Sequence, residues 1–125
     1  MRICIDLDGV ICNLKKSGES YDELKPMPGA IDKIKHLKNE GHYIIIHTAR
    51  RMKTHSSNKG KLLKDIGKVT LDWLDKYNVE YDEIYFGKPW ANVYIDDNAF
   101  RFQTWDKIDN KGKNLPASNE SKIKN

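Results

Sequence analysis

Short apolar runs divide the chain into candidate strands. Residues 2–7 and the segment HYIIIHTAR (residues 42–50), with three consecutive isoleucines, each read as a buried strand. DEIYF (residues 82–86) predicts a third strand, and NVYID (residues 92–96) predicts a fourth. We therefore expect a sheet of four short strands.

Helical spacing separates these runs. Ile31, Ile34 and Leu37 recur at intervals of three, and Gly41 after them is typical of a helix end. Apolar positions with mixed spacings of three and four predict a longer helix over residues 62–77, and a short final helix is expected within residues 98–108.

Strands that alternate with helices favour an α/β fold whose parallel sheet carries helices on both faces. Ligands of such sheets bind beyond the carboxyl ends of the strands. Here the strongly polar residues follow successive strands: Asp6 and Asp8, then Thr48, then Lys88, then Asp96 and Asp97. We expect them to share one crevice.

Length and charge narrow the picture. The 125 residues suit one domain over 1–109, with residues 13–28 as a loop or small flap and 110–125 as a mobile polar tail. The net charge is +4, and the tail with four lysines and one glutamate supplies +3 of it, which disfavours a nucleic-acid-binding core. No long apolar stretch or secretory signal is seen, and Cys4 and Cys12 are expected to stay reduced, so a cytoplasmic protein is expected.

Four carboxylates in one crevice repel one another, by about 4 kcal/mol for a pair ~4 Å apart at an effective dielectric near 20. Protonation or a bound cation would relieve this repulsion. Hard oxygen ligands beside a phosphate substrate favour Mg²⁺ over zinc.

A carboxylate beside Mg²⁺ and Lys88 is able to attack phosphorus and form an aspartyl-phosphate. Thr48 offers a hydroxyl donor, and Gly9 permits a tight turn whose N–H group, with that of Val10, would face the phosphate. Asp8 lies roughly 7 Å along an extended strand from Asp6, which suits a proton donor to the leaving group. In the basic segment 50–64, Arg50 is the best candidate for contact with an anionic substrate.

The motifs DLDGV, IIIHT, GKP and YIDD, in this order, resemble the four motifs of the haloacid dehalogenase (HAD) superfamily of phosphatases. The resemblance implies a three-layer Rossmann-like sandwich, with Asp6 as nucleophile, Asp8 as general acid/base, and Thr48 and Lys88 holding the phosphoryl group. It also implies Mg²⁺ held by Asp6, the backbone carbonyl of Asp8, and Asp96, with Asp97 assisting.

The motif intervals of about 40 residues leave no room for a large cap domain. Among HAD proteins, the chain is similar to small phosphatases of capsule or surface-polysaccharide biosynthesis, and also to the phosphatase domain of polynucleotide kinase-phosphatases. The first likeness implies a sugar phosphate or a polysaccharide or nucleotide precursor as substrate, the second a nucleic-acid 3′-phosphate. The residues leave open whether the site is open or covered by a neighbouring subunit of a homo-oligomer.

A receiver-like phosphoacceptor signalling domain is the rival of a different class, since it also combines a sheet, an aspartate, a threonine and Lys-Pro. The order of motifs disfavours it, because this chain places Asp-x-Asp first and its Asp-Asp pair after Lys88.

Overall fold

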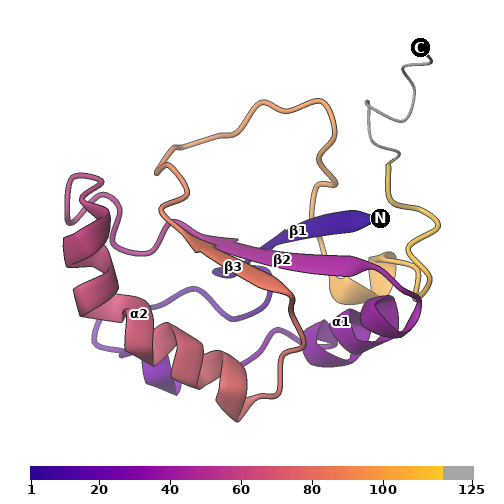
Figure 1. Cartoon of the computed structure of the whole chain (residues 1–125), viewed down its shortest axis with the longest axis horizontal. Helices are drawn as coiled ribbons and strands as arrows, with labels where there is room; N and C mark the ends of the chain where they lie inside the picture. Colours follow the sequence, from indigo (N-terminus) through magenta and orange to yellow (C-terminus); the bar gives the residue numbers. More distant parts are fainter. Residues whose placement is uncertain (117–125) are drawn as a thin grey trace.

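The computed structural model describes residues 1–116. Its strands are β1 (Arg2–Asp6), β2 (Tyr43–Thr48) and β3 (Glu83–Phe86), its α-helices are α1 (Ala30–Asn39) and α2 (Lys59–Lys76), and its 3-10 turns are η1 (Tyr21–Glu23) and η2 (Trp105–Lys107). The three strands are parallel and lie in the order β1-β2-β3 (Figure 1). The predicted α/β class without a large cap is therefore confirmed. Among the described residues, no helix has the length and hydropathy needed to cross a bilayer.

The pleat of the sheet sorts side chains between its two faces. Ile5 lies beside Ile46, and Ile46 beside Ile84, in adjacent strands, so these apolar side chains share one face. One position further along each strand, Asp6, His47 and Tyr85 form the corresponding row on the other face. The first row lies in or against the apolar core, while Tyr85 is exposed.

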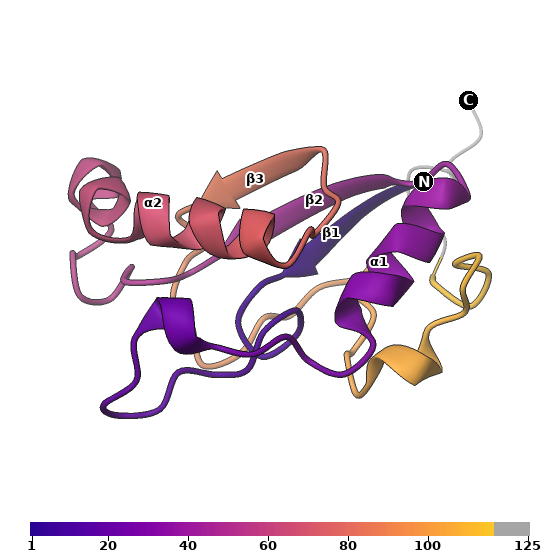
Figure 2. The ribbon, with the colours of Figure 1, turned by 90° about the horizontal axis from the view of Figure 1, so that it is seen from below.

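Both α-helices pack on the face that carries the isoleucines. Ile34 of α1 and Trp73 of α2 belong to the same core cluster as Ile44 and Ile46 of β2. Figures 1 and 2 show α1 and α2 on one side of the sheet. The sequence predicted helices on both faces, but within residues 1–116 the opposite face carries the exposed residues Cys4 and Tyr85.

Local signals placed the helix ends. Gly41 adopts φ 90°, and its N–H donates to the carbonyl of Lys38 while that of His42 donates to Leu37, which ends α1 as predicted. Helix α2 begins three residues before the predicted start, because the side chain of Asn58 accepts the N–H of Lys61 and caps the first turn.

The predicted fourth strand is absent from the described sheet, and the predicted short final helix is a single 3-10 turn. Residues 91–99 form an exposed connection past the free edge of β1 (Figure 1), and the side chain of Ile95 is 97 % exposed. A strand exists through hydrogen bonds to a neighbour, and residues 92–96 form none of the ladder pairings of the described sheet. The expected helix within residues 98–108 is the single turn η2.

Two peripheral segments are attached to the core. The predicted flap, residues 13–28, contains the buried Leu24, whose carbonyl accepts the indole N–H of Trp73 at 2.7 Å. Within the predicted tail, Leu115 packs against the core, and the Asp109 carboxylate accepts the backbone N–H groups of Lys111 and Lys113. The remainder of that predicted tail, 117–125, lies outside the described residues.

Candidate active site

Asp6 ends β1 and lies beside Lys88. The N–H of Leu7 donates to Asp6 Oδ1 at 3.1 Å, and Lys88 Nζ lies 3.7 Å from Asp6 Oδ2. Lys88 follows β3 through Gly87, whose φ of 93° suits glycine, and the N–H of Lys88 donates to the carbonyl of Thr48. The parallel register thus brings the ends of all three strands together, as predicted.

A groove of about 440 Å³ opens beside these two residues along the free edge of β1. Its lining includes Asp6, His47, Lys88, Tyr94 and Asp96. Asp6 and Asp96 therefore face the same groove, although the strand expected to present Asp96 is absent from the described sheet. Asp97 is exposed on the same connection and is not among the lining residues.

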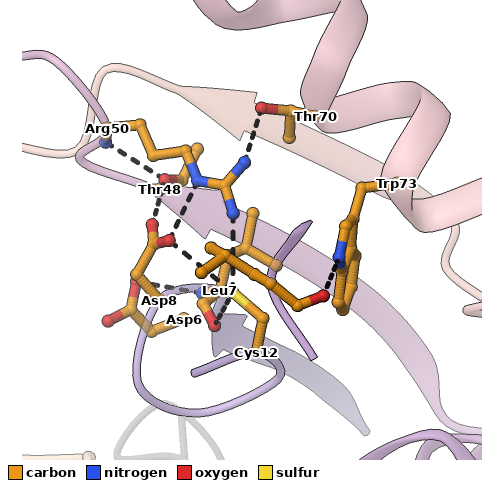
Figure 3. Close-up of polar contacts among 9 residues, drawn as sticks. Asp6, Leu7, Asp8, Cys12, Thr48, Arg50, Thr70 and Trp73 are labelled. Atoms are coloured by element: carbon orange, nitrogen blue, oxygen red, sulfur yellow. Dashed lines mark hydrogen bonds and ion pairs between the residues drawn. The ribbon is translucent and has the colours of Figure 1, made fainter. Parts of the chain in front are cut away.

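The Asp8 carboxylate contacts Thr48 at the end of β2 and Arg50 just beyond it. After the buried Leu7 the chain turns at Gly9, with φ 83°, so Asp8 does not continue the row of Asp6. Thr48 Oγ1 donates to Asp8 Oδ2 at 2.9 Å, and Arg50 Nε donates to Asp8 Oδ1 at 2.9 Å (Figure 3). The two acids of DLDGV thus have different partners, which the sequence did not predict.

Arg50 lies inside the protein and not at the basic rim where the sequence placed it. Its side chain is 1 % exposed. Besides Asp8, its guanidinium donates from Nη1 to Thr70 Oγ1 at 2.9 Å and from Nη2 to Cys12 Sγ at 3.4 Å (Figure 3), and it lies 4.3 Å from the ring centre of Tyr21. Sequence reasoning missed Cys12, Thr70 and Tyr21, because only the fold brings them to Arg50.

Three groups predicted to face a phosphate are engaged within the protein. Thr48 is fully buried, and its hydroxyl donates to Asp8 while accepting the N–H of Arg50. The N–H of Gly9 donates to Cys12 at 2.8 Å, and that of Val10 donates to Leu7 at 3.4 Å. The N–H groups of Gly9 and Val10 could contact a phosphoryl group only after the turn opens. The Thr48 hydroxyl could do so only after it rotates away from Asp8.

Burial and neighbouring charges shift the pKa values of two groove residues, Asp6 and His47, and of the buried Cys12. Burial raises the pKa of Asp6, Lys88 opposes this, and the charge of Asp8 adds to the rise. Burial lowers the pKa of His47, and the charge of Lys88 lowers it further. Burial, with a contribution from Asp8, raises the pKa of Cys12 to about 12. Asp6 is therefore a carboxylate that an added cation would stabilise.

The donor set is compatible with Mg²⁺, although it is not a preformed cage. Among residues 1–116, no three His, Cys, Asp or Glu side chains surround one point. Mg²⁺ retains several waters and commonly uses only one or two carboxylates plus substrate oxygens. Asp6 and Asp96, which face one groove, are such a pair. The pKa of Asp6 is raised chiefly by burial, so a cation beside it would favour its ionised form.

Comparisons with known proteins place the chain in a family. No family model and no curated protein matches it. A crystal structure of a structural-genomics target from Vibrio cholerae matches with 37 % identity and a TM-score of 0.73, over 80 % of this chain and 82 % of that one. The chain belongs to the same family as this Vibrio cholerae protein. The name of that relative states no activity, so membership establishes the fold and leaves the reaction open.

Two weaker matches are chains from the Pnkp1/Rnl/Hen1 complex and the Pnkp1/Rnl/Hen1 RNA repair complex. Both are 24 % identical over 78 % of this chain, which corresponds to 30 % and 28 % of theirs, with TM-scores of 0.49 and 0.47. Likeness at this level carries no argument about function. The reaction has to be inferred from the residues of the groove.

Proposed function

We propose that this protein is a Mg²⁺-dependent phosphomonoester hydrolase of the HAD type. The observation that carries the proposal is the Asp6 carboxylate at the end of β1, with Lys88 Nζ 3.7 Å from it and Asp8 two residues away. An acid, a fixed positive charge and a second acid are what phosphoryl transfer to a carboxylate needs. The order of the four motifs supports the same reading.

In the first step, Asp6 is the nucleophile. The N–H of Leu7 holds Oδ1, which leaves Oδ2 on the side of Lys88 to attack phosphorus. A bond forms between Asp6 Oδ2 and phosphorus while the bond from phosphorus to the ester oxygen breaks. The leaving oxygen takes a proton from the carboxyl group of Asp8, and Lys88 stabilises the charge on the phosphoryl oxygens.

In the second step, water releases the phosphate. The Asp8 carboxylate accepts a proton from the water as the water oxygen bonds to phosphorus, and the bond to Asp6 breaks. Asp6 returns to its carboxylate. Asp8 either keeps the proton for the next leaving group or gives it to solvent, which restores its ion pair with Arg50. One acid thus serves first as proton donor and then as proton acceptor, which suits turnover better than storage of a phosphoryl group.

Asp6 and Asp96 would hold Mg²⁺, and the motif resemblance adds the carbonyl of Asp8 and the side chain of Asp97. When bound, the ion supplies positive charge to the phosphoryl oxygens. Within residues 1–116 no large cap covers the groove, so a leaving group can lie outside it. From the motif resemblance we infer a sugar phosphate or a polysaccharide or nucleotide precursor as substrate.

The test measures release of phosphate from p-nitrophenyl phosphate by the wild type with Mg²⁺, by the wild type with EDTA, and by Asp6→Asn with Mg²⁺. We expect activity only in the wild type with Mg²⁺. Asp72→Asn is the matched control, since Asp72 pairs with the exposed Lys68 on the solvent side of α2. Undiminished release in EDTA, or full activity of Asp6→Asn, would refute the mechanism, and no release from a wide panel of phosphoesters would refute the function.

A further inference from the structure

We propose that Arg50 is a positioning residue that fixes the carboxylate of Asp8 for proton transfer. This rests on the proposed function, because it concerns how Asp8 performs its step. The sequence suggested that Arg50 binds substrate directly. Its burial and its contact with Asp8 assign it the different task of orienting a catalytic group.

Each nitrogen of the guanidinium donates to a different residue. Nε donates to Asp8, Nη1 to Thr70 of α2, and Nη2 to Cys12 of the turn after β1. The ring of Tyr21, from η1, lies 4.3 Å from the guanidinium carbon. An arginine fixed in this way has one geometry, so its Nε hydrogen has one direction, and that direction is toward Asp8 Oδ1.

Holding Oδ1 determines which oxygen of Asp8 is available for chemistry. Among residues 1–116, the donor to Oδ2 is the hydroxyl of Thr48, and a hydroxyl has a single hydrogen to donate. If Thr48 turns that hydrogen to a phosphoryl oxygen, Oδ2 is released while Arg50 still holds Oδ1. Oδ2 is therefore the oxygen that carries the transferred proton, and Arg50 keeps the carboxylate from rotating away from it.

The kinetic test compares a good and a poor leaving group. The value of kcat/KM includes the steps up to departure of the leaving group, so a fault in proton donation lowers it more for glycerol 2-phosphate than for p-nitrophenyl phosphate. For Arg50→Met we expect at least a tenfold greater loss on the alkyl ester, a part of the roughly 10²–10⁴-fold that general acid–base catalysis contributes. Asp8→Asn should show the same difference between the losses on the two esters, which we call the leaving-group split.

Two variants separate positioning from folding. Thr70→Val removes the far support of Arg50 without touching Asp8, and should show a smaller split of the same sign. Leu74→Val, a core change in the same helix, lowers stability and should affect both esters equally. If Arg50→Met does not fold, Arg50→Lys and Thr70→Val decide the matter.

A double variant tests whether Arg50 acts through Asp8. Adding Arg50→Met to Asp8→Asn should not widen the leaving-group split further, because the group that Arg50 orients is already disabled. Equal losses on both esters for the Arg50 and Thr70 variants, or an undiminished effect of Arg50→Met in the Asp8→Asn protein, would overturn the proposal.

A measurement without substrate keeps this proposal separable from the proposed function. In ¹H–¹⁵N spectra, the Nε–H of Arg50 should exchange slowly compared with that of the exposed Arg2, and its resonance should move in Asp8→Asn and in Thr70→Val. Exchange as fast as that of Arg2, or no shift in Asp8→Asn, would refute the contact whatever the activity. A wild type that shows the contact but hydrolyses no ester would refute the function alone.

Discussion

Replacement of Asp8 by alanine should destabilise the protein strongly, because it leaves the charge of Arg50 buried without a counter-ion. The side chain of Arg50 is 1 % exposed, and its other side-chain hydrogen bonds go to the neutral groups of Thr70 and Cys12. Removal of one partner from a buried pair costs about 3–5 kcal/mol. Since the Asp8 side chain is 22 % exposed and water can enter the vacated space, we expect about 2–3 kcal/mol.

One effect opposes this loss. The charge of Asp8 raises the pKa of Asp6, which shows that the two acids repel each other, and alanine at position 8 relieves that repulsion. Both carboxylates are partly exposed, so solvent screens their interaction, whereas the guanidinium has almost no solvent to replace its partner. We therefore expect the loss at Arg50 to exceed the gain at Asp6.

The assay is urea unfolding of the metal-free protein at pH 7, followed by tryptophan fluorescence, since Trp73 and Trp105 are buried. A loss of 2–3 kcal/mol corresponds to a fall in Tm of about 8–12 °C for a chain of this size. Asp72→Ala is the matched control, because the Lys68–Asp72 pair is exposed at 89 % and 61 % and should contribute little to stability.

The double variant Asp8→Ala/Arg50→Met removes both charges and should be clearly more stable than the sum of the single losses predicts. If Asp8→Ala lost no more than Asp72→Ala, or if the two single losses simply added, then the ion pair would not have the energetic role inferred from its burial.

Three further predictions test other parts of the fold. With Ellman's reagent at pH 8, the exposed Cys4 should react in the native protein, and Cys12 should react only after unfolding. A pKa of about 12 leaves the Cys12 thiol almost wholly protonated at that pH, so two fast-reacting thiols would contradict its burial. The folded protein lowers the pKa of His47 below its ordinary 6.5, so as pH falls the unfolded chain binds a proton at His47 before the folded one does. The free energy of unfolding should therefore fall between pH 7 and 5, and fall less in His47→Gln than in the wild type, whereas parallel pH profiles would contradict this. Ile95→Ser should change the free energy of unfolding by under about 0.5 kcal/mol, because the side chain is exposed; a loss above 1 kcal/mol would show that residues 92–96 dock as a strand in solution.

Features set by neighbours in sequence could be predicted, and features set by distant contacts could not. The strands over residues 2–6, 43–48 and 83–86 follow from apolar runs, and the end of α1 follows from Gly41, since each depends on a few adjacent residues. The burial of Arg50 depends on Tyr21, Cys12 and Thr70, which come from three separate segments. From the sequence alone, a buried arginine beside a basic loop therefore cannot be distinguished from an arginine at the surface.

The predicted fourth strand also failed because it depends on a distant contact. The residues NVYID have the composition of a strand, yet pairing depends on whether the chain beyond Lys88 returns along β1 or passes around it. In the described structure it passes around it (Figure 1), and Asp96 still reaches the groove that holds Asp6. The shared crevice was predicted from where each strand ends, so it does not require the pairing of residues 92–96 with β1.

The separation of Asp6 from Asp8 has a physical cause that bears on the proposed mechanism. Strand alternation would place both carboxylates on one face, but Leu7 is buried in the core and Gly9 turns the chain at a φ of 83°, which redirects Asp8 toward β2. Asp6 is left facing the groove and Lys88, while Thr48, Arg50 and Cys12 donate to Asp8. A nucleophile must reach phosphorus and a proton carrier must keep its direction. A short turn around one buried leucine gives two chemically identical side chains these different environments.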